Sequence, residues 1–151
     1  MSDLPLRLAA LNADYARCID DDRLEEWPGF FLERCLYKIT TADNHARGYE
    51  AGLVYADSRA MLQDRVSALR EANVYERQRY RHLMGQPVVR DGGAFETPFL
   101  VVRIMRDGKM DLFATGRYLA RVSDQNGNLK FAERVVVCDS SRFDTLLAIP
   151  L

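Results

Sequence analysis

The chain has 151 residues, of which 48% are hydrophobic and 28% are charged, and its formal net charge is -1. This length and composition fit a single folded domain over residues 1–151 and exclude a disordered chain. The small net charge argues against a nucleic-acid or membrane-surface binder, because such proteins need a basic excess. Eighteen of the 21 basic residues are arginine. That bias favours ion-paired interfaces, since guanidinium groups pair with carboxylates in bidentate geometry, although genomic base composition can also produce it.

The cysteines give no sign of an oxidising compartment. Cys18, Cys35 and Cys138 are an odd number at wide spacing, which fits no disulfide framework. We expect reduced thiols that pack as small apolar side chains. No segment has the pattern of a signal peptide, and no apolar run approaches the roughly 20 residues that span a bilayer. The sequence therefore predicts a cytoplasmic protein.

The first part of the chain predicts two helices and then a strand. Apolar residues recur at helical spacing from Pro5 to Ile19, which is typical of an amphipathic helix. An acidic run ends this helix, and a second, short helix is expected to begin near Arg23. A strand is expected over 35–40, and a polar loop over 41–48.

The remainder predicts one helix followed by a sheet. Ser58 is a suitable N-cap for the third helix. Beyond it, β-branched and aromatic residues alternate with polar ones between glycine-containing turns. This pattern predicts strands near 79–89, 97–106, 111–122 and 129–138. The expected fold class is α+β, with N-terminal helices packed on the concave face of a curved, mainly antiparallel sheet.

The most distinctive segment is DRVSALREANVYERQRYRH, residues 64–82, which sets five arginines around two tyrosines. On a strand, the side chains at positions 77, 79 and 81 would share one face. Such a row suits carboxylates on a neighbouring chain or other anionic groups. The alternative is a solvated strand edge that charge protects against mis-pairing. The residues concerned are Arg65, Arg70, Tyr75, Arg77, Arg79, Tyr80 and Arg81.

The histidines limit the metal chemistry of the chain. A two-His, two-Cys iron–sulfur centre together with a two-His, one-carboxylate iron site would need four histidines. The sequence has only His45 and His82. It also lacks C-x-x-C, H-E-x-x-H, G-x-G-x-x-G, P-loop and serine-nucleophile motifs. We therefore expect no metal or cofactor in this chain.

One group of residues leaves catalysis open. Tyr15, Asp20, Trp27, Tyr37 and His82 would approach the mouth of a helix-capped curved sheet, where an acid or base in apolar surroundings serves a dehydratase or isomerase. The interpretation that we favour is structural: Trp27 belongs to the core, Tyr15 supports helix packing, and His82 is hydrogen-bonded locally.

Three segments together resemble the small (beta) subunit of bacterial Rieske non-haem-iron aromatic-ring-hydroxylating oxygenases. The similarity covers nearly the whole chain, and within the family it is greatest to small subunits of terephthalate dioxygenase and salicylate hydroxylases. The segments are 15–40 with Glu26-Trp27-Pro28, 64–83 with Asp64-Arg65-Val66 and Arg81-His82-Leu83, and 116–139 with Glu133-Arg134 and Cys138-Asp139.

The resemblance implies a cone-shaped fold of the nuclear-transport-factor-2-like, or cystatin-like, type. It further implies a trimer of this chain beneath three large (alpha) subunits, an alpha3beta3 hexamer. The large subunits would carry a [2Fe-2S] Rieske cluster and a mononuclear Fe(II), with electrons arriving from NAD(P)H through a reductase, directly or by way of a ferredoxin.

On this view the chain is a non-catalytic assembly subunit of an oxygenase that acts on an aromatic carboxylate. Its candidate interface and structural residues are Arg65, Arg70, Tyr75, Arg77, Arg79, Arg81, His82, Trp27 and Asp20. Two rival classes stay open. One is a stand-alone dehydratase or isomerase with Asp20, Tyr37 or His82 as acid or base, and the other is a small-ligand binding module that uses the cone as its pocket.

Overall fold

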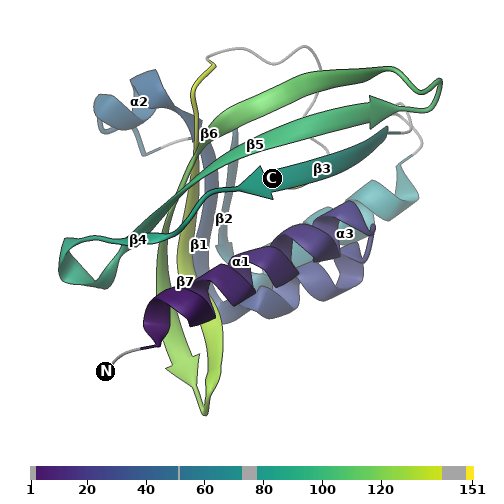
Figure 1. Cartoon of the computed structure of the whole chain (residues 1–151). Helices are drawn as coiled ribbons and strands as arrows, with labels where there is room; N and C mark the ends of the chain where they lie inside the picture. Colours follow the sequence, from purple (N-terminus) through teal and green to yellow (C-terminus); the bar gives the residue numbers. More distant parts are fainter. Residues whose placement is uncertain (1–2, 51, 73–77, 141–148) are drawn as a thin grey trace.

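A curved sheet of seven strands wraps around the N-terminal helix in the computed structural model, which describes residues 3–50, 52–72, 78–140 and 149–151 (Figure 1). The helices are α1 (Leu4–Asp20), the 3-10 helix η1 (Leu24–Phe30), α2 (Ala42–Ala46), α3 (Arg59–Glu71) and the 3-10 turn η2 (Asp91–Gly93). The strands are β1 (Phe31–Thr41), β2 (Val54–Ser58), β3 (Gln78–Met84), β4 (Val88–Val89), β5 (Phe95–Met105), β6 (Met110–Gln125) and β7 (Asn128–Cys138).

The strand order is β2-β1-β7-β6-β5-β3, and β4 pairs with β5 beside β3. All pairs are antiparallel except β1 with β7, which run parallel. Figure 1 shows α1 and α3 on the same side of the sheet, against its concave face. The α+β prediction is therefore confirmed, with a sheet that is mixed and open.

The predicted helices form where the sequence places their start signals. Proline lies in the first turn of α1, and the buried side of this helix includes Leu8, Tyr15 and Ile19. At the start of α3, the Ser58 hydroxyl accepts a hydrogen bond from the Met61 amide at 3.2 Å, which satisfies one of the free amides of the first turn. The helices predicted from Pro5 and after Ser58 are thus confirmed, and the short helix expected near Arg23 is the 3-10 helix η1.

Three details of the prediction are wrong. The predicted loop 41–48 contains α2, which is capped by the Thr41 hydroxyl through the Asn44 amide at 3.2 Å. The strand β2 was not predicted. The single strand expected over 79–89 is two strands, β3 and β4, since Pro87 lies between them and has no amide to donate to a ladder.

Aromatic rings fill the space between the helices and the sheet. Tyr15, Trp27, Phe31, Tyr37 and Phe131 are each 0% exposed, and edge-on contacts with centroid separations between 5.1 and 6.3 Å join most neighbouring pairs. Edge-to-face rings in this range attract one another beyond simple area burial. Trp27 is thus a core residue, as the structural interpretation predicts.

Candidate functional site

The edge strand β3 sorts its side chains onto two faces. Arg79, Arg81 and Leu83 are exposed, whereas Tyr80 and His82 are buried, as the two-residue period of a strand requires. Arg79 and Arg81 therefore share a face, as the alternation predicts. The third member of the predicted row, Arg77, and the candidate interface residue Tyr75 lie outside the described residues.

A buried carboxylate joins the end of α1 to β3. Asp20 is the last residue of α1, and its Oδ2 accepts a hydrogen bond from the His82 backbone amide at 2.8 Å. Its Oδ1 lies 2.7 Å from Nδ1 of the His82 ring. Because a carboxylate only accepts hydrogen bonds, this contact places the ring proton on Nδ1. Asp20 therefore fixes both the backbone and the imidazole of the edge strand.

The geometry of this pair favours a structural role over acid–base chemistry. The His82 side chain is 0% exposed, and its Nε2 has no hydrogen-bond partner among the described residues. Nδ1 is occupied by Asp20. Arg81 adds a cation at the rim, with Nη1 3.9 Å from Asp20 Oδ2. A general base must reach the proton that it removes, and this imidazole is closed to any molecule outside.

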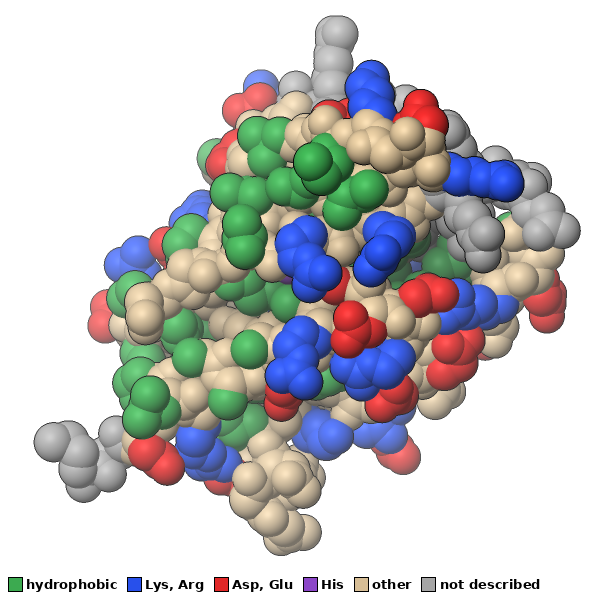
Figure 2. Space-filling model, turned by 45° about the vertical axis from the view of Figure 1, so that its right-hand side comes forward, with side chains coloured by type: hydrophobic (Ala, Val, Ile, Leu, Met, Phe, Trp, Pro, Cys, Tyr) green, Lys and Arg blue, Asp and Glu red, His purple; other side chains and the backbone are tan. Residues whose placement is uncertain are grey.

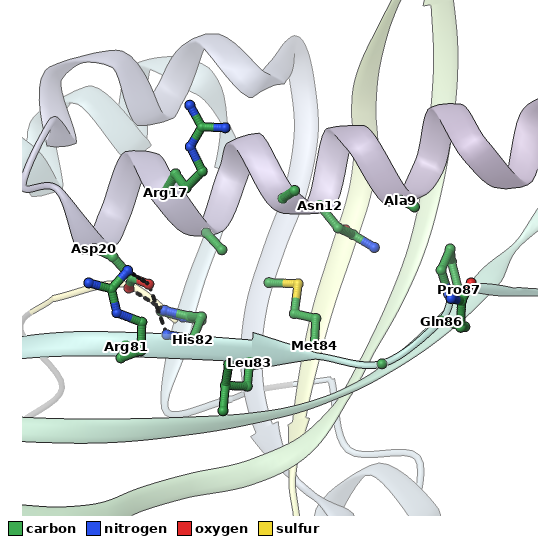
Figure 3. Close-up of a pocket in the computed structure, with 13 residues that line it drawn as sticks. Ala9, Asn12, Arg17, Asp20, Arg81, His82, Leu83, Met84, Gln86 and Pro87 are labelled. Atoms are coloured by element: carbon green, nitrogen blue, oxygen red, sulfur yellow. Dashed lines mark hydrogen bonds and ion pairs between the residues drawn. The ribbon is translucent and has the colours of Figure 1, made fainter.

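A hollow of about 440 Å³ lies beside the pair, between α1 and β3. Figure 3 shows Asp20 from α1 meeting Arg81 and His82 from β3 at one end of this hollow, with Gln86 and Pro87 at the other end. Alanines of α1 form much of the opposite wall. The wall of the hollow is therefore largely apolar, and its exposed charges are the arginines at its edge, Arg17 and Arg81.

The five residues of the rival acid–base constellation fall into two separate groups. Tyr15 and Tyr37 lie in the interior, where their hydroxyls donate to the Leu151 carbonyl oxygen at 2.8 and 3.0 Å. Burial raises the pKa of both phenols. No hydrogen bond or ring contact joins these tyrosines or Trp27 to the described pair Asp20 and His82. Both hydroxyls are thus occupied by Leu151, which is itself 0% exposed.

The sequence did not predict that Arg134 is a buried cation. Arg134 on β7 is 0% exposed, and its Nη1 donates to the Asn12 side-chain oxygen at 3.0 Å. Its guanidinium carbon lies 4.0, 3.7 and 4.5 Å from the ring centroids of Tyr15, Tyr118 and Phe131. Cation–π contacts are strongest when desolvated, so this cage stabilises a charge that has no carboxylate partner among the described residues.

Arg70, the second arginine of the distinctive segment, is engaged within the chain. Its guanidinium donates to both carboxylate oxygens of Glu25, with Nε to Oε2 at 2.8 Å and Nη2 to Oε1 at 3.0 Å. Nη1 also reaches Asp22 Oδ1 at 2.9 Å. These bonds tie α3 to η1 and to the turn that precedes it. Arg65, which lies on the same helix, is half-buried.

We expect the Arg70 contacts to make stability depend on pH. Hydrogen bonding from Arg70 lowers the pKa of Glu25 from its usual 4.5. A lowered folded-state pKa adds stability above the unfolded-state pKa, and this stability is lost as pH falls through the folded value. Because the pair is exposed, we expect Arg70→Met to lower the free energy of unfolding at pH 7 by only about 0.5–1 kcal/mol.

Urea unfolding of Arg70→Met and the parent chain between pH 3 and pH 7 measures this effect. The difference between the two proteins should shrink at the acidic end. Arg17→Met is the matched control, because the Arg17 guanidinium lies 3.9 Å from Asp14 and both side chains are exposed. A pH-independent difference for Arg70→Met would contradict the assignment.

The remaining ligand types give no metal site in the described ranges. No cluster of three or more His, Cys, Asp or Glu residues there is arranged to hold a metal ion. Burial raises the pKa of Cys18 to about 11 and that of Cys138 to about 12. Burial thus favours the neutral thiol over the thiolate at both positions. Across the described helices, none is both long and apolar enough to cross a membrane.

Comparison with known families identifies the class. The model of the ring hydroxylating beta subunit family matches residues 14–145. The chain therefore belongs to this family, and it is the beta subunit of an aromatic-ring-hydroxylating dioxygenase, an oxidoreductase assembly.

Two relatives narrow the comparison. The chain is 51% identical over 150 residues to the beta 1 subunit of the terminal oxygenase component of terephthalate 1,2-dioxygenase from Comamonas sp., with 97% of each chain covered. It is 38% identical over 141 residues to the anthranilate 1,2-dioxygenase small subunit of Burkholderia cepacia, with 91% of this chain and 88% of the relative covered.

Solved structures agree with the fold. The beta subunit of a protein assigned as an aromatic-ring-hydroxylating dioxygenase from Novosphingobium aromaticivorans superimposes with a TM-score of 0.88 at 36% identity, covering 98% of this chain and 97% of that one. A cystatin-like protein from Nostoc punctiforme, at 13% identity and a TM-score of 0.63, covers 93% of this chain and 96% of its own length. At this low identity the likeness shows only that the two proteins share a fold.

Proposed function

We propose that this chain is the non-catalytic assembly subunit of a terminal oxygenase that hydroxylates an aromatic carboxylate, with terephthalate as the first candidate substrate. The observation that carries the proposal is the 51% identity, over 97% of both chains, to a terephthalate 1,2-dioxygenase beta subunit. The anthranilate dioxygenase relative supports the same chemical class, since both named substrates are benzene rings that bear a carboxylate.

The proposal assigns the redox groups to the large subunit. That subunit would hold the Rieske [2Fe-2S] cluster and the mononuclear Fe(II), and a reductase would supply electrons from NAD(P)H. The closed Asp20–His82 pair supports this division of labour, because the His82 side chain is 0% exposed and its Nδ1 is occupied by Asp20. We place the complex in the cytoplasm, as an alpha3beta3 hexamer with three copies of this chain.

Co-expression with the large subunit tests the proposal. The purified beta subunit alone should contain no stoichiometric iron and show no visible absorption of an iron–sulfur cluster. The complex should contain both and, with a reductase and NAD(P)H, should oxidise terephthalate faster than anthranilate, benzoate or salicylate. The large subunit alone is the control, and its activity should be at least about 100-fold lower.

Two results would contradict the proposal. An iron–sulfur spectrum in the isolated beta subunit would move the redox chemistry into this chain. Full activity of the large subunit without this chain would remove the assembly role. A preference for another aromatic acid would change the substrate and leave the assembly role intact.

A further inference from the structure

The side of the sheet that faces away from α1 carries a connected apolar surface, here called the outer β3–β5–β6 face. Its side chains alternate with the buried residues of the same strands, and ladder pairing sets them side by side. Read from β3 to β6, its rows are Arg79, Ile104 and Met110, then Arg81, Val102 and Leu112, then Leu83 and Leu100.

This face is open to solvent in the single chain. Leu83, Met110 and Leu112 are 57, 68 and 64% exposed, and the three apolar residues of β5 between them are half-buried. Figure 2, which brings the right-hand side of Figure 1 forward, shows hydrophobic side chains gathered in its upper half above neighbouring basic ones. Contiguous exposed apolar surface with a polar rim is typical of a protein interface.

Basic groups lie at the β3 edge of this face, where the Arg81 guanidinium turns back toward Asp20 of α1 (Figure 3). Arg79 forms no ion pair with any described residue, and Arg81 has only the 3.9 Å contact to Asp20. Guanidinium groups beside apolar surface are common anchors of interfaces, because they pair with carboxylates in planar geometry. A partner for this face should therefore offer apolar side chains together with carboxylates.

The opposite edge of the sheet presents that combination. The surface around the edge strand β2, here called the β2 edge surface, consists of Tyr49, Leu53, Tyr55 and Met61, with the carboxylates of Glu50 and Asp57. All four apolar residues are exposed, by between 38 and 54%. Neither carboxylate takes part in an ion pair with a residue in the described ranges.

Strand pairing and hydrogen bonds hold the residues of the β2 edge surface together. Lys38 pairs with Tyr55 in the β1–β2 ladder, and its ammonium donates to the carbonyl oxygens of Tyr49 and Glu50 at 3.4 and 3.1 Å. The Asp57 amide lies 3.5 Å from the Met61 sulfur. These contacts hold the loop, the strand and the start of α3 together as one surface.

We infer that the outer β3–β5–β6 face of one copy docks on the β2 edge surface of the next copy, and that this contact, used three times, closes the trimer. The inference rests on the proposed function, which supplies the number three. The two surfaces lie at opposite ends of the strand order β2-β1-β7-β6-β5-β3. Two different surfaces on one chain make a head-to-tail contact, which generates a ring when the rotation closes.

Charge decides between a head-to-tail contact and a two-fold one. Pairing the outer face with itself would bring the arginines of both copies into one interface, and like charges across an interface are unfavourable. Pairing it with the β2 edge surface sets the arginine edge of β3, with Arg79 as its unpaired member among the described residues, against Glu50 and Asp57. It also covers exposed leucines and methionines with exposed tyrosines and leucine.

Two substitutions on the full-length chain test the contact from both sides. Leu112→Asp places a carboxylate in the middle of the outer face, and Tyr55→Asp places one in the β2 edge surface. Each should weaken self-association at least about 100-fold, because burying an unpaired charge is costly. Each variant should still fold, and its melting temperature should lose only the concentration-dependent part that association supplies. Leu6→Asp is the matched control: Leu6 is 76% exposed, lies on α1 and belongs to neither surface.

Mixing the two variants gives the sharpest result. Leu112→Asp keeps an intact β2 edge surface and Tyr55→Asp keeps an intact outer face, so one good contact remains between them. Light scattering should find monomers for each variant alone, a mixed dimer for the two together, and a trimer for Leu6→Asp and the parent chain.

Each other outcome overturns the inference in a distinguishable way. Trimers formed by either variant would show that its surface is not the contact between copies, while leaving the proposed function standing. If Leu112→Asp stays trimeric but no longer captures the large subunit, the outer face belongs to that partner instead. A monomeric parent chain would remove the proposed trimer itself.

Discussion

Replacing Arg134 with alanine is expected to lower the free energy of unfolding by about 3–5 kcal/mol, the size seen when a large, fully buried side chain is truncated. The guanidinium is 0% exposed and lies against three aromatic rings. Its removal leaves a cavity between α1 and β7 and strands the Asn12 amide oxygen that accepts from it. Thermal or urea unfolding of the purified chain measures the loss.

Two further substitutions separate packing from charge at this position. Arg134→Met keeps much of the volume without a buried cation, and such exchanges are often close to neutral. Arg134→Lys keeps the charge but loses the planar group that stacks on the rings, so it should cost more than methionine. If lysine were tolerated better than methionine, the cage of Tyr15, Tyr118 and Phe131 would not be the source of stability.

Replacing Asp20 with alanine is expected to cost about 2–5 kcal/mol. The carboxylate accepts from the His82 amide at 2.8 Å and faces Nδ1 of its ring at 2.7 Å. Both groups are buried, and a buried donor without an acceptor costs about 1–3 kcal/mol. Because the pair fixes β3, we also expect weaker capture of the large subunit in a co-purification assay.

The neighbouring aspartate provides the control. Asp21 is exposed and lies 3.7 Å from Arg23, so Asp21→Ala should change stability by less than about 0.5 kcal/mol. The contrary outcome for Asp20→Ala is specific. Unchanged stability with abolished oxygenase activity in an intact complex would make Asp20 a participant in the chemistry and would revive the acid–base rival.

The sequence predicts elements whose signals are local. The helix from Pro5 is visible because its apolar residues follow a period of 3.6, and the hairpins β5–β6 and β6–β7 are visible because glycine turns separate alternating runs. The short strand β2 has no such signal, since it has only five residues, of which just Val54 and Ala56 are buried. The helix α2 is hidden for the same reason, as five polar or small residues carry no period.

The candidate site depends on contacts between residues that are far apart in the sequence, and most of these contacts could not be predicted from it. Alternation correctly places Arg79 and Arg81 on one face, but nothing local pairs Arg70 with Glu25, 45 positions away. The burial of Arg134 could have been predicted, because it lies two and four positions before the buried residues Val136 and Cys138 on the same strand. The pairing of β6 with β7 changes register between Glu133 and Phe131. Phe131 and Arg134 are therefore both buried although they are three positions apart, and a strict two-residue alternation does not predict this.

The parallel pairing of β1 with β7 sets the order in which this protein can be completed. Phe31 lies beside Phe131, 100 positions later in the chain, and the order β2-β1-β7 leaves one side of β1 unpaired until β7 arrives. Contacts between distant segments form late, because the long intervening loop must first be closed. During synthesis the hairpin of β1 and β2 therefore waits with one open strand edge, and such edges recruit other chains. Because β7 ends at Cys138, the window for mis-pairing lasts from the synthesis of β2 to that of β7, which is about half of the chain.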